Sequence, residues 1–258
     1  DNATLVVVGD TTLDEIVPML ETHFGDWRGT GPAPAAIDVA EVARPDAARV
    51  FLIDQPGAVQ ANIFAAQVIP PTNDASSTRF DMANTVIGGD FTARLNMTLR
   101  EDKHWSYGAR SSASGTLGQR PWMASAPVQI DKTAEAMLEI DREIRELGTT
   151  RRPTGQEILE ARNDMLLGMP ARLQGSVGVL GLYRTAYEHN LPDDYWNAYV
   201  PRIQALTPSQ IESAAARLYD PSTLTWIVVG DLGEIEADVR ALGLGAVEVV
   251  DVEGNRIR

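Results

Sequence analysis

IGGDFTARLNMTLREDKHWSYGARS, residues 87–111, is the stretch that decides the fold of this chain. It follows a helical pattern over Ser76–Ile87 that stops at a pair of glycines, as helices commonly do. A second, short helix is predicted over Ala93–Glu101, and after a charged turn a strand opens at Tyr107. The stretch therefore predicts a helix, a close turn, a short helix and a strand in immediate succession.

Strands are predicted on both sides of this stretch. Arg49–Asp54 and Ala61–Ile69 are apolar, rich in β-branched residues and separated by a Gln-Pro-Gly turn signal, so we expect them to pair antiparallel. Tyr107–Ser114 and Met123–Ile130 flank a turn that contains glycine and proline, and they are expected to form a hairpin. The central part of the chain is therefore dominated by antiparallel strands.

From Thr133 onward the pattern is helical. Apolar residues recur at helical spacing before Gly148, and Thr154-Gly155-Gln156-Glu157 fits a capping box at the start of the next helix. The helices predicted in this part are Thr133 to Leu147, Thr154 onward, Ser176 to His189, Asp194 to Leu206, Pro208 to Tyr219 and Leu232 to Leu242. Strands followed by helices predict an α+β, two-layer sandwich, in which a mixed, mostly antiparallel sheet is covered by helices on one face.

A short sequence pattern occurs twice, once near each end of the chain. Leu5–Asp10 (LVVVGD) is repeated almost unchanged as Trp226–Asp231 (WIVVGD), and each copy is followed by a predicted helix. The two aspartates could form a catalytic pair, but Gly-Asp before a helix is typical of capping, and we favour that interpretation. We expect a strand at Thr4–Val8 and a helix to about Phe24, so that two strand-turn-helix units lie in one sheet. Gly25–Pro45 is predicted to be an extended connection.

Composition excludes several classes of function. The 258 residues carry a net charge of −14, which disfavours nucleic acid as a partner, and the chain has no cysteine for disulfides, thiol chemistry or cysteine-based metal sites. The longest apolar runs are the length of a strand, so no membrane span is predicted. The chain starts without Met or a basic leader and enters a strand at once, so we expect it to be a piece of a longer protein.

No motif for a complete catalytic site is present in the sequence. The histidines are His23, His104 and His189, and none is followed four positions later by another histidine, so no HxxEH-type zinc motif occurs in either direction. A metal site formed by carboxylates from distant parts of the sequence is the alternative that this search for motifs does not decide. The Gly-x-Ser-x-Gly turn of serine hydrolases is absent, and no glycine-rich stretch fits a phosphate loop.

The block from Gly88 to Tyr107 resembles the second-domain signature of the M16 peptidases, the family of insulinase, pitrilysin and the mitochondrial processing peptidase. That signature has a glycine pair, an Arg-Leu step, Leu-Arg-Glu and an aromatic-x-Tyr after a short gap, all found here in order. The Val-Val-Gly-Asp strands near both ends also follow the family order, so the resemblance covers residues 1 to about 240. It implies a LuxS/MPP-like metallohydrolase fold, with residues 1–258 as a single C-terminal-type domain and residues 243–258 as a tail with a last short strand.

In this family, zinc is held by an inverted HxxEH motif in the N-terminal half, and this chain lacks it. The resemblance therefore implies a C-terminal half that binds no metal itself and completes a zinc site in another domain. Arg100 and Tyr107 match the residues that face the zinc, where they would bind substrate and stabilise the transition state. Without the resemblance, Arg100 would simply pair with Glu101 or Asp102, and Tyr107 would cover the core. Trp105 could line the substrate cavity or belong to the core.

The partners implied are a zinc-bearing M16 half, in the same parent chain or as a separate subunit, and unfolded peptide substrates. This chain would not be active as an enzyme alone. The main alternative is an M16-like subunit without catalysis that binds or acts as a scaffold; an unrelated ligand-binding module on the same architecture is a third. The tail resembles the end of long tandem M16 proteins of bacteria, which favours a periplasmic location.

Overall fold

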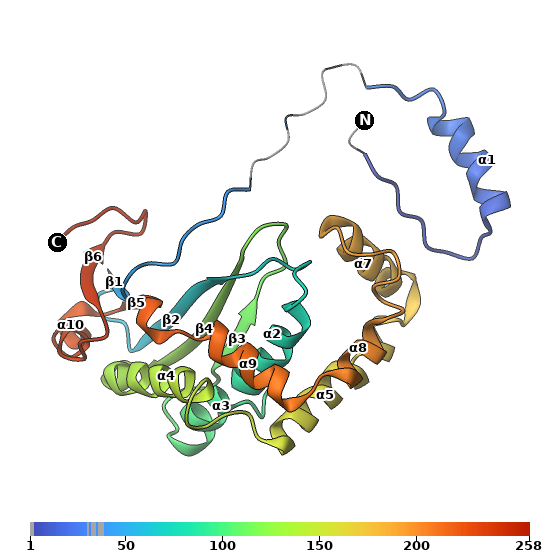
Figure 1. The fold of residues 1–258 in the computed structure, drawn as a ribbon. Helices are drawn as coiled ribbons and strands as arrows, with labels where there is room; N and C mark the ends of the chain where they lie inside the picture. Colours follow the sequence, from blue (N-terminus) through green and yellow to red (C-terminus); the bar gives the residue numbers. More distant parts are fainter. Residues whose placement is uncertain (1–2, 30, 32–34, 36–38) are drawn as a thin grey trace.

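A computed structural model describes residues 3–29, 31, 35 and 39–258 of the chain (Figure 1). Within these residues a mixed sheet of six strands has the order β3-β4-β2-β5-β1-β6. The strands are β1 (Arg49–Asp54), β2 (Gln60–Ile69), β3 (Arg110–Ala113), β4 (Arg120–Gln129), β5 (Thr225–Gly230) and β6 (Ala246–Val250). The predicted hairpin is confirmed as β3 and β4, which pair antiparallel.

The predicted pairing of β1 with β2 is wrong, because β5 lies between them. β5 runs parallel to β1 and antiparallel to β2, and β6 pairs in parallel with the other edge of β1. Trp226 and Val228 of β5 are fully buried and its alternate residues are partly buried, which suits a strand with neighbours on both sides. A turn signal between two strands shows that the chain bends, but it does not show which strands become neighbours.

The helices follow the predicted order. They are α2 (Ser77–Asn84), η1 (Thr85–Gly89), α3 (Arg94–Asn96), η2 (Met97–Asp102), η3 (Ile130–Lys132), α4 (Thr133–Leu147), α5 (Gly155–Leu167), α6 (Met169–Arg172), α7 (Gly175–Glu188), α8 (Tyr199–Ala205), α9 (Pro208–Leu218), η4 (Pro221–Thr223) and α10 (Leu232–Ala241). The capping box at Thr154 is confirmed. The helix predicted over Asp194–Leu206 is shorter than expected, since only its second half, α8, is helical.

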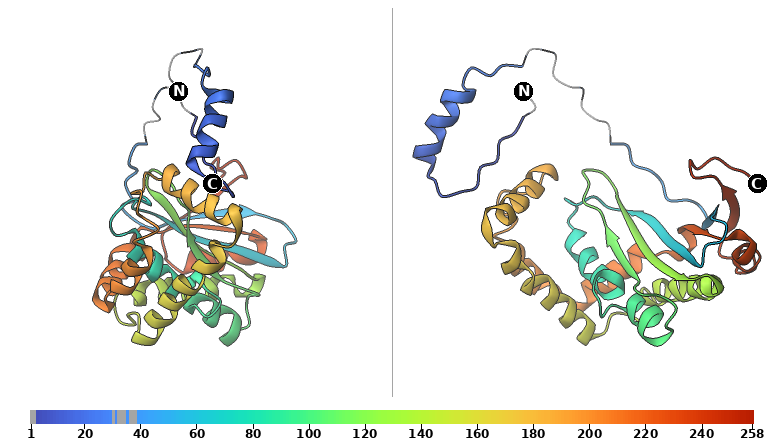
Figure 2. Two further views of the ribbon diagram at one scale, coloured as in Figure 1. Left: turned by 90° about the vertical axis from the view of Figure 1, so that its right-hand side faces the viewer. Right: turned by 180° about the vertical axis from the view of Figure 1, so that it is seen from behind.

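The sheet has one covered face and one open face. Alternate strand residues, among them Leu52, Ile63, Trp122 and Trp226, are fully buried and form one core with apolar residues of the helices. Figures 1 and 2 show helices such as α4 and α9 packed on this side of the sheet, while the intervening strand residues on the other side stay partly exposed. The predicted α+β fold, a mixed sheet covered by helices on one face, is confirmed.

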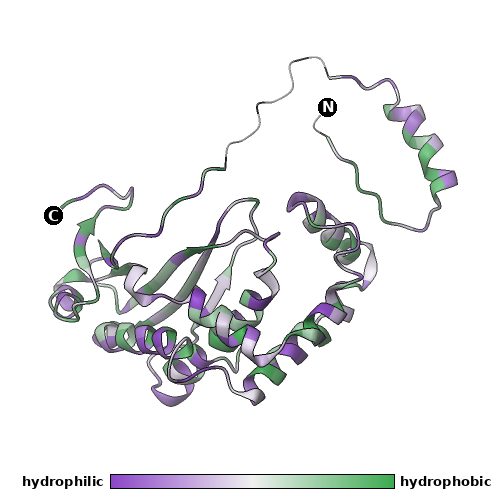
Figure 3. Cartoon of the chain, viewed as in Figure 1, coloured by the Kyte–Doolittle hydropathy of each residue, from purple (hydrophilic) through white to green (hydrophobic). Residues whose placement is uncertain are grey.

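The N-terminal segment lies apart from this sheet. The predicted helix is confirmed as α1 (Leu13–Phe24), whose Thr12 and Glu15 form a capping box. The predicted strand at Thr4–Val8 is wrong: these residues are extended but pair with no strand in the part of the chain that the structure describes. The other copy of the repeat, Trp226–Asp231, does lie in the sheet, because it contains most of β5. No residue of α1 is buried; Figure 3 shows a mostly hydrophobic extended segment before this helix and both hydrophobic and hydrophilic residues on it.

The link from α1 to β1 carries no helix or strand among its described residues. This agrees with the predicted extended connection over Gly25–Pro45, of which residues 30, 32–34 and 36–38 lie outside the described part. The N-terminal segment contacts the helical part through a hydrogen bond from the Thr4 hydroxyl to the Tyr187 hydroxyl of α7.

Candidate functional site

The glycine pair of the decisive stretch allows the chain to pack against an edge strand. A Cβ atom on Gly88 would lie 2.5 Å from the backbone nitrogen of Ser111 in β3, closer than such atoms approach in proteins. Asn84 reinforces this contact, because it accepts a hydrogen bond from the Ser111 hydroxyl (2.7 Å) and donates one to the Ser111 carbonyl (3.2 Å). The edge of the sheet is thereby covered by η1, a π-helical turn, which is a conformation often found near functional sites.

Arg94 anchors the next part of the stretch to α5. The side chain is buried, and its guanidinium donates two hydrogen bonds to the Glu157 carboxylate, at 2.6 and 2.8 Å. Burial alone would raise the pKa of Glu157, but the hydrogen bonds from Arg94 and from the Thr154 cap outweigh burial and lower that pKa below its ordinary value. A charged, bidentate pair therefore holds the short helix in place.

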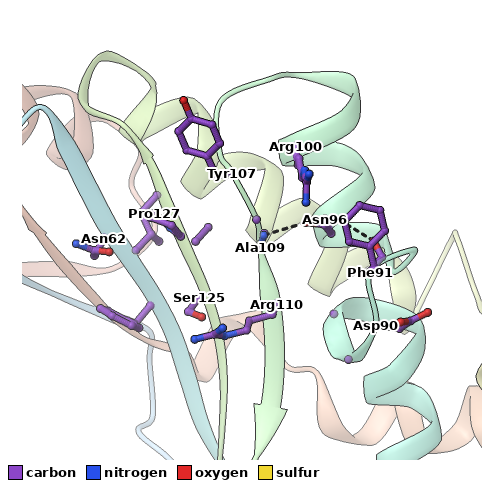
Figure 4. Close-up of a pocket in the computed structure, with 16 residues that line it drawn as sticks. Asn62, Asp90, Phe91, Asn96, Arg100, Tyr107, Ala109, Arg110, Ser125 and Pro127 are labelled. Atoms are coloured by element: carbon purple, nitrogen blue, oxygen red, sulfur yellow. Dashed lines mark hydrogen bonds between the residues drawn. The ribbon is translucent and has the colours of Figure 1, made fainter. Parts of the chain in front are cut away.

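Asn96 connects the two sides of the candidate site. Its side-chain oxygen accepts a hydrogen bond from the Ala109 backbone (3.2 Å), and its side-chain nitrogen donates one to the Phe91 carbonyl (2.7 Å) (Figure 4). The Phe91 ring in turn lies 4.7 Å from the guanidinium carbon of Arg100, in cation–π contact. Asn96 and Phe91 were not predicted as site residues, although Asn96 lies one helical turn before Arg100 and so on the same helix face.

Arg100 and Tyr107 both project from this framework. Arg100 lies in η2, its side chain is 40% exposed, and it forms an ion pair of 3.2 Å with Glu101, the alternative partner considered from the sequence. Tyr107 is 86% exposed, so the alternative that it covers the core is wrong. Neither side chain is part of the buried core, and both are accessible to a ligand.

The two side chains line one open cavity, of about 730 Å³, between the end of η2 and the open face of the sheet (Figure 4). The sheet contributes Asn62 and Phe64 from β2, Arg110 from β3 and Ser125 from β4. The structure therefore brings together Arg100 and Tyr107, which the resemblance singled out, and adds polar and apolar groups from three strands.

Trp105 has a mixed position. Its ring is partly buried against the core, and its backbone is fixed by hydrogen bonds to the Leu99 carbonyl (2.9 Å) and from the Gln129 nitrogen (3.0 Å). Trp105 also lines a second depression, which adjoins the first and shares Arg100 and Tyr107 with it. Both roles considered for Trp105 are therefore compatible with its place in the fold.

Metal ligands do not gather anywhere in the described residues: no group of three or more His, Cys, Asp or Glu side chains could hold an ion. The histidines lie in α1 (His23), just after η2 (His104) and at the end of α7 (His189). The described residues thus do not fit a zinc centre of their own. A membrane-crossing helix of sufficient length and apolar character is likewise not found in that part of the chain.

A comparison with models of known protein families identifies the family of this chain. Residues 1–165 match the model of the peptidase M16 inactive domain. The chain belongs to the M16 inactive-domain family. The family match includes the N-terminal segment, the glycine pair, Arg100 and Tyr107.

Solved M16 structures have the same fold. The M16 inactive domain of Pseudomonas fluorescens is similar with a TM-score of 0.70 and 21% identity over 77% of this chain and 47% of that one. A protease from Helicobacter pylori gives 0.78 and 16%, over 86% and 54%. The periplasmic protease PqqL from Escherichia coli gives 0.69 and 13%, over 86% and 24%. This chain thus spans about half the length of the first two relatives. No curated protein sequence matches it.

Proposed function

We propose that this chain is the C-terminal half of a zinc-dependent M16 endopeptidase, which closes a peptide chamber and supplies Arg100 and Tyr107 to a zinc site in another half. The observation that carries the proposal is that both side chains, which the core does not need, open onto one cavity. The family, whose domain of this type is described as inactive, supports a role that depends on a partner.

The chemistry assigned to the two residues is electrostatic. Zinc in the partner half would activate the water that attacks the peptide bond, since the described residues of this chain contain no group of three or more side chains that could hold the ion. The Tyr107 phenol O–H would donate a hydrogen bond to the carbonyl oxygen of the peptide as negative charge grows on that oxygen. Arg100, held by the Phe91 ring, would bind a neighbouring backbone carbonyl and fix the peptide.

The N-terminal segment supports a partner half of similar fold. Leu5–Asp10 nearly repeats the sequence of Trp226–Asp231, which contains most of β5, and β5 has hydrogen-bonded strands on both edges. Leu5–Asp10 itself pairs with no strand among the described residues. When the two helices are aligned at their N-caps, Thr12 and Asp231, the α1 residues Leu13, Ile16 and Leu20 correspond to Leu232, Ile235 and Val239 of α10, which are buried. A sheet in the partner half would bury this segment as the present sheet buries its repeat.

We extend the proposal to a longer bacterial parent protein that acts in the periplasm. The sequence of the tail supports this placement, and the relative from Escherichia coli is described as periplasmic. The partner half would then be joined to this chain covalently, and unfolded peptides would be its substrates.

The test is to measure cleavage of an unstructured peptide and bound zinc for this chain alone, for the zinc-bearing half alone and for the mixture. Cleavage that appears only in the mixture and is abolished by a chelator is the expected result. Activity or one bound zinc per molecule in this chain alone would refute the proposal. An inactive mixture that still binds peptide would instead favour the binding or scaffold role.

A further inference from the structure

The open face of the sheet carries a continuous row of side chains. The strand registers place Arg110 opposite Ser125, Ser125 opposite Phe64, and Phe64 opposite Ile227. These four residues come from β3, β4, β2 and β5 and point away from the helical layer, because their strand neighbours are the buried ones. The row changes from polar, at the candidate site, to apolar at the middle of the sheet.

Charge on this face differs in sign from charge on the whole chain. The charged side chains among the open-face strand residues are Arg49, Arg110 and Glu248, so two positive charges and one negative charge give +1, against −14 for the chain. Glu248 lies on the edge strand β6, far from Arg110 in strand order, and pairs with Arg256 at 3.6 Å. The end of the face next to the candidate site therefore has a positive charge that β6 does not neutralise.

Arg110 has no anionic partner in the part of the chain that the structure describes. The other charged groups that line the same cavity are Arg100, paired with Glu101, and Asp90, which accepts a hydrogen bond from Thr92 at 3.0 Å. The Arg110 side chain extends from β3 across β4, next to Ser125 (Figure 4). Arg110 is therefore a guanidinium that lines this cavity and has no carboxylate bound to it.

Two further polar groups line the same cavity. The Ser125 hydroxyl, adjacent to Arg110 on β4, and the Asn62 side-chain amide of β2 form no hydrogen bond to any described residue, and both line the cavity. A ligand carboxylate at this position could accept two hydrogen bonds from the guanidinium and another from the hydroxyl or the amide. The apolar ring of Phe64 lies next in the row and can cover an apolar side chain.

We infer that Arg110, Ser125 and Asn62 form a subsite for an acidic side chain of a bound peptide, with an adjacent apolar residue placed on Phe64. The inference rests on the proposed function in so far as the ligand is a peptide that lies in the chamber. It assigns a substrate class: segments in which a Glu or Asp lies near an apolar residue. The overall negative charge of the chain would have suggested the opposite preference, but two of the three charged residues that line the cavity, Arg100 and Arg110, are positive.

The test uses two fluorescent, unstructured peptides that are identical except for one central Glu or Gln. Their affinities for the 258-residue chain are measured by fluorescence anisotropy. We expect the Glu peptide to bind about tenfold more tightly, because a charge-assisted hydrogen bond is lost in the Gln peptide. In the Arg110→Gln variant, the ratio of the two affinities, Glu peptide to Gln peptide, should fall to about one. The matched control is Arg217→Gln, which removes the same charge from an exposed position on α9, in the helical layer, and should keep the ratio.

Failure of the inference can be told apart from failure of the proposed function. Equal or absent binding of the two peptides by the wild-type chain, or a ratio that survives in Arg110→Gln, would overturn the subsite. The binding measurement needs neither zinc nor the partner half, so a clear Glu preference of this chain, together with a mixture of the two halves that cleaves nothing, would refute the peptidase and leave the subsite standing. Circular dichroism checks that each variant is folded.

Discussion

Arg100 and Tyr107 illustrate how single residues are positioned for a role outside the core. Asn96 bonds the backbone on both sides of the site, and Phe91 holds the Arg100 guanidinium. Tyr107→Phe and Arg100→Ala should each lower kcat/KM for peptide hydrolysis by the assembled protein by about tenfold or more, because each removes a donor that acts in the transition state. Thermal unfolding should be unchanged, since both side chains are substantially exposed. Wild-type rates in both variants would rule out the assignment.

The pair of Arg94 with Glu157 makes a second prediction at the scale of single residues. The pKa of Glu157 is lower in the folded chain than its ordinary value, so the pair stabilises the fold above that ordinary pKa, and the stabilisation is lost as the pH falls through the folded pKa. Glu157→Gln should therefore cost about 2–4 kcal/mol at pH 7, because buried Arg94 loses its carboxylate, and progressively less in acid.

Urea unfolding at several pH values measures this dependence. Glu160→Gln is the control: it removes an exposed carboxylate from the same helix and should change stability by less than about 0.5 kcal/mol at each pH. A cost for Glu157→Gln that does not vary between pH 7 and pH 3 would show that the charge of Glu157 has no part in the stabilisation.

At the scale of elements, the contact of η1 with β3 depends on one glycine. In Gly88→Ala the new methyl group would meet the backbone of Ser111 and of Arg110, at 2.5 and 3.0 Å, and backbone atoms cannot turn away as a side chain can. We expect a loss of about 1–3 kcal/mol in unfolding free energy. Gly181→Ala is the control, because that helical glycine has open space around it and should gain up to about 1 kcal/mol. Equal melting temperatures for the two variants would contradict this account.

The elements also show what can be predicted from a sequence and what cannot. Capping residues and apolar spacing are local, so α1 and α4 were predicted close to their observed bounds, and the start of α5 was predicted at its observed cap. Pairing is not local: β5 separates β1 from β2, although residues 70–224, more than half of the chain, lie between β2 and β5 in sequence. For the same reason the pattern at Thr4–Val8 identified a strand-forming segment but not the sheet to which it belongs.

The candidate site was predictable to a similar degree. Arg100 and Tyr107 were found through the family resemblance, because their motif is a matter of sequence order. Asn62, Arg110 and Ser125 share the cavity with them only after three strands have come together, and nothing in the local pattern marks these residues. Residues that a site recruits by tertiary packing are therefore the ones that sequence reasoning misses.

The whole molecule combines a covered sheet with an N-terminal segment that buries none of its helix. If this segment belongs to the sheet of a partner half, Val7→Asp should leave the thermal unfolding of this chain unchanged, because Val7 is 45% exposed. The same change should weaken association with the zinc-bearing half by tenfold or more, since a charge would enter a buried strand. The measurement is analytical ultracentrifugation of the mixed halves.

Two further variants make the result specific. Val252→Asp adds the same charge at another exposed valine, in the C-terminal tail, and association should stay at the wild-type level. Val228→Asp places the charge at the equivalent position of the repeat, in fully buried β5, and should unfold the chain itself. If Val7→Asp and Val252→Asp associate equally well with the other half, the N-terminal segment is not part of that interface, and its apolar residues need another explanation. If Val7→Asp alone loses association with the zinc-bearing half, the two copies of one sequence pattern stabilise two different sheets, and neither half is complete without the other.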